Sequence, residues 1–151
     1  VLVAEDNEVN QLVISAVLDN LGCSYQLASD GGMTLAACDD REQPFDAILM
    51  DVNMPQMDGL EVTRLLRQRE RQRASLPGGP VWIVGLTANA MVGDRQKCLE
   101  AGMDDYVSKP FYEDDIRAAL NRGLARRHAA RDSSVRDDVR QWASPRRIPG
   151  S

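Results

Sequence analysis

Four apolar runs in this 151-residue chain each give way to polar side chains that are able to do chemistry. A carboxylate at the point where a buried strand ends has lost part of its hydration and faces a loop, which suits metal binding or attack on a phosphoryl group. If the four runs are parallel strands, their carboxyl ends lie along one edge of a sheet. Three acids, a hydroxyl and an amine then meet at that edge: Glu5, Asp6, Asp51, Thr87 and Lys109.

These side chains form a set suited to phosphoryl transfer. Three neighbouring carboxylates repel one another, and a divalent cation relieves the repulsion; hard oxygen ligands favour Mg²⁺ or Ca²⁺ over Zn²⁺. Mg²⁺ in particular binds one or two carboxylates together with phosphate oxygens. Lys109 would neutralise charge on the phosphoryl group, and Thr87 would donate a hydrogen bond to it. Asp51 would be the in-line nucleophile and form an acyl phosphate.

Strands and helices are expected to alternate five times along the chain. The expected strands are residues 1–4, 23–28, 47–50, 81–86 and 105–107. The expected helices are residues 9–21, 33–38, 59–70, 91 or 92 to 101, and a last one that begins near 111 or 112 and runs past 124. This alternation predicts an α/β fold in which a parallel sheet has helices on both faces.

The first helix has the clearest pattern. Apolar residues recur at helical spacing and predict a helix with one apolar side: Val9, Leu12, Val13, Ala16, Val17 and Leu21. Asp6 or Asn7 is expected to cap its start, and Gly22 to end it.

The net charge of −5 is distributed unevenly, with −10 over residues 1–121 and +5 over residues 122–151. An acidic globular part argues against nucleic-acid binding. The three cysteines have no metal-ligand spacing and are expected to be reduced, buried side chains. No apolar stretch is long enough to span a bilayer, and no signal peptide is recognised. We expect a cytoplasmic domain without membrane contact of its own, with the cytoplasmic part of a membrane-anchored sensor kinase as the other possibility. Because the chain starts inside a strand, we expect it to be a fragment of a longer protein.

Four motifs in order along the chain carry a family resemblance. They are Glu5-Asp6-Asn7, Met50 to Gly59 with its Met-Pro and Asp-Gly pairs, Leu86-Thr87-Ala88, and Tyr106 to Pro110. Over about residues 1–122 the sequence resembles a receiver domain of two-component signalling, the module of response regulators and hybrid histidine kinases. The resemblance implies a doubly wound, flavodoxin-like sheet of five parallel strands in the order 2-1-3-4-5, flanked by five helices.

The resemblance also implies roles for individual residues. Asp51 is the expected phosphoacceptor and Lys109 binds the phosphoryl group. Thr87 and Tyr106 form a switch pair, and the Lys109–Pro110 peptide bond is cis. The expected Mg²⁺ ligands are Glu5, Asp6, Asp51 and the backbone carbonyl of Asn53.

The expected function is that of a phosphoacceptor in a histidine-to-aspartate phosphorelay. The wording of the motifs resembles receivers fused to hybrid sensor histidine kinases, so the expected partner is a kinase dimerisation domain or a histidine phosphotransfer domain. Phosphorylation is expected to repack the face formed by the fourth helix, fifth strand and fifth helix. We expect a receiver domain at residues 1–124 and a charged extension, partly helical or disordered, at residues 125–151.

Three alternatives stay open at this point. The chain could be a stand-alone response regulator, or an interaction module that works without phosphorylation. It could also be an aspartyl-phosphate phosphatase, although Asn53 stands where such enzymes usually have a second acid. We expect a signalling domain without turnover of a diffusible substrate. The arginines between residues 64 and 73 are expected to form a solvated face, with partner contact as the alternative.

Overall fold

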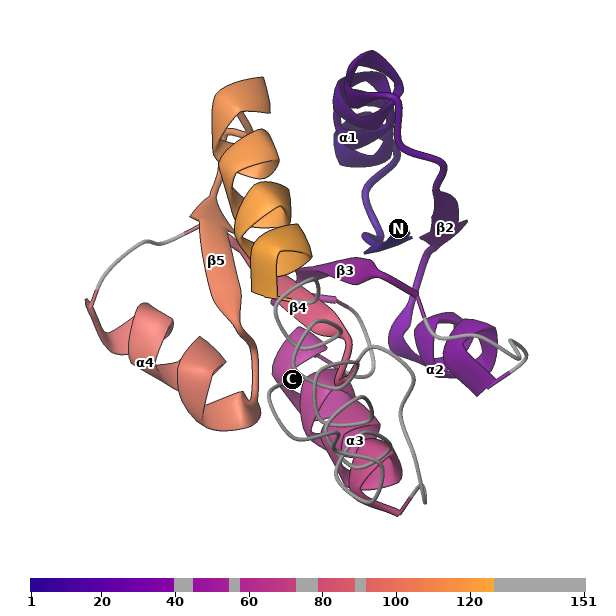
Figure 1. Cartoon of the computed structure of the whole chain (residues 1–151), viewed down its shortest axis with the longest axis vertical. Helices are drawn as coiled ribbons and strands as arrows, with labels where there is room; N and C mark the ends of the chain where they lie inside the picture. The colour runs from indigo at the N-terminus through magenta and orange to yellow at the C-terminus, as the bar shows by residue number, and fades with distance from the viewer. Residues whose placement is uncertain (40–44, 55–57, 73–78, 89–91, 127–151) are drawn as a thin grey trace, which may run out of the picture.

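The computed structural model describes residues 1–39, 45–54, 58–72, 79–88 and 92–126. Within them, five parallel strands form one sheet in the order β2-β1-β3-β4-β5 (Figure 1). The strands are β1 (Leu2–Ala4), β2 (Gln26–Ala28), β3 (Ala47–Asp51), β4 (Trp82–Thr87) and β5 (Asp105–Ser108). The helices are α1 (Glu8–Leu21), α2 (Gly31–Asp39), α3 (Gly59–Arg71), α4 (Val92–Ala101) and a fifth helix at residues 113–126. The predicted fold and strand order are confirmed.

Side chains of each strand alternate between the two faces of the sheet, as the strand pleat requires. Val3, Leu49 and Val84 pack on the face covered by α1 and the fifth helix. Their neighbours Leu2 and Ile48 pack on the opposite face, with α2, α3 and α4. Figure 1 shows these two helix layers on either side of the sheet. Burial of β1, β3 and β4 on both faces explains why their sequences are continuous apolar runs.

α1 forms as predicted, but its buried side differs from the predicted apolar side. Asn7 is the cap, since its side chain accepts hydrogen bonds from the N–H groups of Val9 and Asn10, and Gly22 ends the helix at φ 75°. The buried residues are Ile14, Val17 and Leu18. Four of the residues used for the prediction are instead exposed: Val9 (66%), Leu12 (71%), Val13 (40%) and Ala16.

Most boundaries agree with the prediction to within one residue, and the starts of β2 and α2 differ by more. β2 is confined to Gln26–Ala28, three residues shorter at its start than expected. α2 begins at Gly31, two residues earlier than expected. The reason is the Asp30 carboxylate, which accepts a hydrogen bond of 2.7 Å from the Met33 N–H and so caps the helix before its glycines.

The prediction that the arginines of α3 form a solvated face is wrong for Arg67, which is only 14% exposed. Its guanidinium forms ion pairs of 2.7 Å with both Glu70 and Asp104. It also donates to the carbonyl oxygens of Gly102 and Val81, each at 2.9 Å. Arg67 therefore joins α3 to β4 and to the segment before β5, whereas Arg64 on the same helix is exposed.

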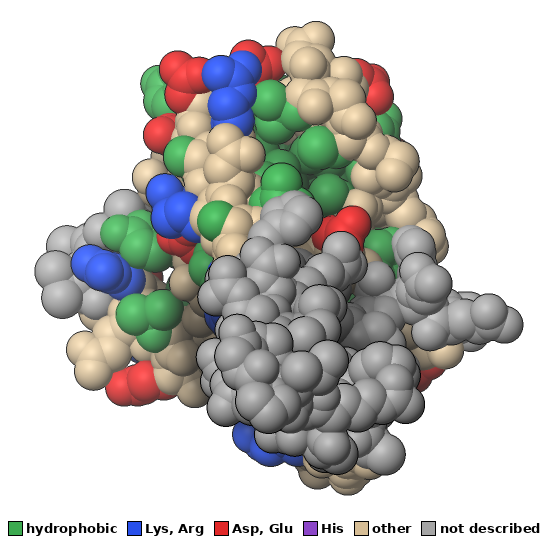
Figure 2. All heavy atoms as spheres, viewed as in Figure 1, with side chains coloured by type: hydrophobic (Ala, Val, Ile, Leu, Met, Phe, Trp, Pro, Cys, Tyr) green, Lys and Arg blue, Asp and Glu red, His purple; other side chains and the backbone are tan. Residues whose placement is uncertain are grey.

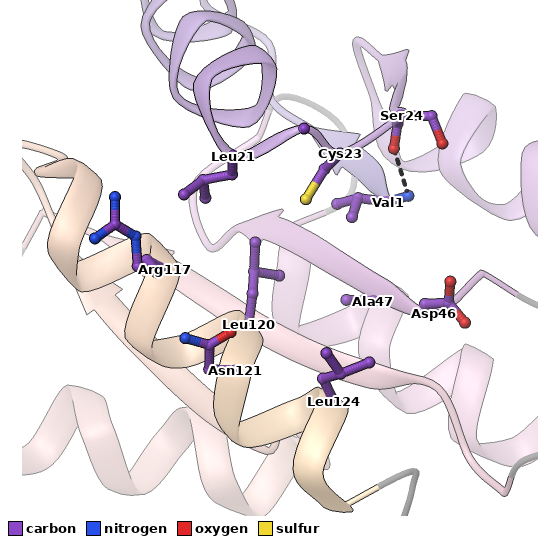
Figure 3. Close-up of a pocket in the computed structure, with 11 residues that line it drawn as sticks. Val1, Leu21, Cys23, Ser24, Asp46, Ala47, Arg117, Leu120, Asn121 and Leu124 are labelled. Atoms are coloured by element: carbon purple, nitrogen blue, oxygen red, sulfur yellow. Dashed lines mark hydrogen bonds between the residues drawn. The ribbon is translucent and has the colours of Figure 1, made fainter.

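A hollow of about 530 Å³ lies at the amino-terminal ends of the strands. It is lined by Val1, by Leu21 at the end of α1, by Cys23 shortly after it, and by Leu120 and Leu124 of the fifth helix (Figure 3). Figure 2 shows hydrophobic side chains gathered in this part of the surface, between α1 and the fifth helix. Because it opens at the opposite ends of the strands from Asp51, the hollow is separate from the predicted site.

None of the helices in the described part of the chain is long and apolar enough to span a bilayer. The fifth helix continues to residue 126 across the predicted boundary at 124. The rest of the predicted extension, residues 127–151, lies outside the described residues. That this segment is partly helical or disordered stays a prediction.

Candidate functional site

The polar residues predicted to converge lie at the carboxyl ends of four adjacent strands. Glu5 follows β1, Asp51 is the last residue of β3, and Thr87 is the last residue of β4. Lys109 follows β5 directly. Since these strands are neighbours in the parallel sheet, their ends form one edge, as the sequence predicted.

Three carboxylates form a tight cluster at this edge. One oxygen from each of Glu5, Asp6 and Asp51 can be chosen so that all lie within 4.8 Å of one another. Glu5 and Asp51 are buried, with exposures of 0% and 1%, while Asp6 is exposed. Two buried carboxyl groups and one solvent-facing carboxylate at this separation form a group of oxygens suited to a cation.

Lys109 supplies the positive charge of the site. Its Nζ lies 3.3 Å from Asp51 Oδ1 and 3.8 Å from Glu5 Oε2. The Lys109 N–H donates to the carbonyl oxygen of Thr87 at 2.7 Å, which fixes the backbone at the end of β5. The Lys109–Pro110 peptide bond is cis, as predicted.

The Asp51 carboxyl is electrostatically unusual. Burial raises its pKa from the ordinary 3.8 to about 7, and the charge of Glu5 and a hydrogen bond with Asp6 act in the same direction. The Asn53 N–H, which donates to Asp51 Oδ1 at 3.1 Å, and the Lys109 ammonium both oppose the rise. The ionised carboxylate is therefore costly in the free site, and a bound cation would relieve that cost.

Glu5 is held by residues that the sequence prediction did not assign. Asn10 Nδ2 and the Asn7 N–H both donate to Glu5 Oε1 at 3.2 Å. Glu5 Oε2 is buried without a hydrogen-bond partner among the described residues. An orphaned buried carboxylate oxygen facing the cluster fits a metal ligand. The signal in the sequence is the position of Asn7 at the cap and Asn10 in the first turn of α1, shortly after the acids.

Gly59 is a second residue that the prediction did not assign to the site. A Cβ added there would lie 2.1 Å from the Asp51 carbonyl oxygen, so only glycine fits. The Gly59 N–H donates to the carbonyl oxygen of Val52 at 3.0 Å, which closes the loop after Asp51. This close approach of α3 to β3 holds Asp51 and the backbone of Asn53 in place.

The predicted switch pair lies beside the cluster. Thr87 is 4% exposed, and Tyr106 is partly buried in the middle of β5. Tyr106 aligns with Gly85 in the register of β4 and β5. Since alternate residues share a face, Tyr106 and Thr87 are on the same face of the sheet.

The family of the chain follows from comparison with known proteins. A family model described as the response regulator receiver domain matches residues 1–121. The chain belongs to this family. All site residues described above fall within the matched part of this receiver domain.

The curated relatives of this receiver domain include large sensor kinases. The hybrid signal transduction histidine kinase L of Dictyostelium discoideum is 38% identical over 123 residues, covering 81% of this chain and 7% of the relative. The sensor histidine kinase GacS of Pseudomonas protegens is 38% identical over 130 residues, covering 85% of this chain and 14% of the relative. The domain thus spans only a small part of the relatives that it matches.

Solved structures of receiver domains share this fold. The receiver domain of the sensor histidine kinase PA1611 from Pseudomonas aeruginosa, with a magnesium ion coordinated in its active site cleft, is 42% identical at a TM-score of 0.70, covering 82% of this chain and 95% of that one. The receiver domain of Ssk1 from Saccharomyces cerevisiae was crystallised with the histidine phosphotransfer protein Ypd1. The matching chain of that complex is 31% identical at a TM-score of 0.71, covering 79% of this chain and 83% of that one.

Proposed function

We propose that this receiver domain accepts a phosphoryl group from a partner's phosphohistidine onto Asp51, with Mg²⁺ as its metal. The observation that carries the proposal is the position of Lys109 Nζ, 3.3 Å from an Asp51 oxygen at the rim of the three-carboxylate cluster. Such a site offers a nucleophile, a cation for the phosphoryl oxygens and ligands for a metal in one place.

The residues present fit Mg²⁺. Glu5, Asp6 and Asp51 offer hard carboxylate oxygens. The buried Glu5 Oε2 accepts no hydrogen bond from the described residues, and its ion pair with Lys109 Nζ is long, at 3.8 Å. The backbone carbonyl of Asn53 is the proposed fourth protein ligand. When bound, the metal supplies charge neutralisation for the acids and for the phosphoryl oxygens. The magnesium ion in the similar PA1611 receiver supports this choice.

The transfer itself needs little more than positioning. An ionised Asp51 oxygen attacks the phosphorus in line, and a new O–P bond forms as the N–P bond to the partner histidine breaks. The electron pair of the broken bond stays on the imidazole nitrogen. Lys109 pairs with one phosphoryl oxygen, and the Thr87 hydroxyl donates a hydrogen bond to another. Lys109 also lowers the pKa of Asp51 and so favours the nucleophilic form.

An apolar patch next to the site supports docking of a helical partner. Val9, Leu12 and Val13 are exposed in the first half of α1, which begins three residues after Glu5. A group of exposed apolar side chains on one helix offers a surface on which a partner helix can pack. The Ssk1 receiver, crystallised with a histidine phosphotransfer protein, is consistent with a partner of this class.

A variant pair tests this docking surface. Leu12→Asp is expected to slow transfer from a phosphorylated histidine phosphotransfer protein that donates to the wild type, without changing phosphorylation by phosphoramidate. Leu99→Asp is the matched control, since Leu99 is 47% exposed on α4. Equal transfer rates for Leu12→Asp and the wild type would exclude the α1 patch.

We also propose that the domain is the receiver of a hybrid sensor histidine kinase, because its curated relatives include several such kinases. The response to phosphorylation would run through Thr87 and Tyr106 to the surface of α4, β5 and the fifth helix. A stand-alone response regulator is the alternative context, and the full-length gene product distinguishes the two. If the domain were a phosphatase, it would hydrolyse a chromogenic phosphate ester over many turnovers. A phosphoacceptor receiver is expected not to do so.

The test of the proposed function is phosphorylation by phosphoramidate with Mg²⁺, followed by intact mass. The wild type is expected to gain one phosphoryl group, and Asp51→Asn or removal of Mg²⁺ by chelation to prevent it. Asp19→Asn, an exposed acid on α1 outside the cluster, is the matched control and is expected to be phosphorylated normally. Labelling of Asp51→Asn to the wild-type extent would overturn the proposal.

A further inference from the structure

Arg95 of α4 stacks on the ring of Tyr106 in β5. The guanidinium carbon lies 5.7 Å from the ring centroid, within the range of a cation–π contact. Both residues line a hollow of about 390 Å³ between α4, β5 and the fifth helix. Arg95 is exposed and Tyr106 is partly buried, so the contact lies near the surface of the domain.

The surroundings of Tyr106 explain why its ring lies by this hollow. Gly85 is its partner in the register of β4. The space beside Gly85 is already filled, since a Cβ there would lie 2.6 Å from the Met103 sulfur and 3.4 Å from the Cys98 sulfur. Val107, the next residue, is buried on the opposite face of the sheet. In this structure, the ring therefore lies against Arg95 rather than over β4.

We infer that Arg95 is a positioning residue, which holds the Tyr106 ring beside α4 and opposes its movement toward Thr87. This inference rests on the proposed function, in which the two residues act as the switch pair. Thr87 is on the same face of the sheet as Tyr106, one alternate position beyond Gly85. For the ring to move toward Thr87, it must leave the guanidinium, so the contact stabilises the unphosphorylated arrangement.

The size of the effect follows from the exposure of the contact. A cation–π contact at a solvent-exposed site shifts a two-state equilibrium by roughly two- to five-fold. That is enough to bias the switch and small enough for phosphorylation to overcome. Arg122, which lines the same hollow, is different because its Nε donates to Asp105 Oδ2 at 2.6 Å. Arg122 is thus a matched control within the same hollow.

The experiment uses the whole chain labelled with 3-fluorotyrosine, with the Tyr106 resonance assigned by Tyr106→Phe. In the free protein, Arg95→Ala is expected to move the Tyr106 resonance toward its position in the complex with Mg²⁺ and beryllofluoride. The same variant is expected to bind beryllofluoride about two- to five-fold more tightly. Without the Arg95 contact, a larger fraction of the free protein is in the conformation that binds beryllofluoride. Arg95→Lys is expected to fall between Arg95→Ala and the wild type.

Arg122→Ala and Lys97→Ala, an exposed cation on α4, are expected to leave both readouts unchanged. An Arg95→Ala protein with the wild-type Tyr106 resonance and beryllofluoride affinity would overturn the inference, as would equal effects from Arg122→Ala. If the wild type fails to bind beryllofluoride, the proposed function fails. The difference in the Tyr106 resonance between the free wild type and free Arg95→Ala, with Arg122→Ala as the control, then still reports whether Arg95 holds the ring, so the two failures are distinguishable.

Discussion

Lys109 Nζ and Asp51 Oδ1 lie 3.3 Å apart, although 58 residues separate them in the sequence. The ammonium also lies 3.8 Å from Glu5 Oε2. One cation is thus shared by two buried carboxylates, which leaves this group of side chains with net negative charge. A divalent metal and a phosphoryl group together restore the balance of charge.

The raised pKa of Asp51 predicts how stability depends on pH without metal. In the folded domain the pKa is about 7, whereas in the unfolded chain it returns to about 3.8. Between these values the folded state binds the extra proton, so stability falls as pH rises. Asp51→Asn removes this destabilisation and is expected to be more stable than the wild type by about 1–3 kcal/mol near pH ~8.

Urea unfolding with a chelator present measures this difference. The advantage of Asp51→Asn is expected to shrink toward pH ~4, where Asp51 is protonated in the folded wild type. A variant that is less stable than the wild type at both pH values would show that the Asp51 carboxylate is favourably paired in the free protein.

Lys109→Ala is expected to separate metal binding from phosphoryl transfer. Without the ammonium, the cluster is more negative, so Mg²⁺ affinity is expected to rise by about three- to ten-fold. Phosphorylation by phosphoramidate is expected to slow, because no cation remains for the phosphoryl oxygen. Calorimetric titration with Mg²⁺ measures the first effect. Lys109→Arg keeps the charge and is the control, and weaker Mg²⁺ binding by Lys109→Ala would contradict the account.

Gly59→Ala is expected to destabilise the domain by about 2–4 kcal/mol, since the added Cβ would overlap backbone. The clash is with the Asp51 carbonyl oxygen at 2.1 Å, so Mg²⁺ binding is expected to weaken too. Gly93→Ala on α4 is the matched control. A Cβ there meets nothing within 4 Å, and alanine at that position is expected to be neutral or stabilising. Equal stability of the two variants would refute the close approach of α3 to β3.

Arg67→Ala is expected to cost about 3–5 kcal/mol, because it removes the cation that pairs with one mostly buried carboxylate and one of the two cations that pair with another, the second being Arg126. Those carboxylates belong to Glu70 and Asp104, which are 15% and 13% exposed. Arg64→Ala on the exposed side of α3 is expected to change stability by no more than about 0.5 kcal/mol. The denaturant midpoints of the two variants are compared with that of the wild type. A loss of stability for Arg67→Ala as small as that for Arg64→Ala would show that the ion pairs of Arg67 contribute no more than those of a solvated surface.

The site could be predicted from the sequence because each of its main residues lies within two residues of the end of an apolar run. A parallel sheet brings such positions to one edge whatever the lengths of the helices between them. Glu5, Asp51, Thr87 and Lys109 required only this rule. Asn10 and Gly59 could not be assigned in this way, since their importance depends on a hydrogen bond and a backbone approach that appear only in three dimensions.

The buried side of α1 shows a second limit of the sequence. Val9, Leu12 and Val13 are as apolar as the buried residues, and both sets are compatible with helical spacing. Which set is buried depends on how the helix lies across the sheet, and the first turns of α1 lie beyond the packed interface. Arg67 was missed for a similar reason, because its partner Asp104 is 37 residues away.

The most direct test of the account is to locate the phosphoryl group chemically. After phosphorylation with phosphoramidate and Mg²⁺, borohydride reduces an aspartyl phosphate to homoserine, and peptide mass spectrometry identifies the position. The account predicts homoserine at position 51 and at no other acid, with none formed when Mg²⁺ is chelated. Homoserine at another aspartate, or a phosphoryl group that resists borohydride, would contradict it.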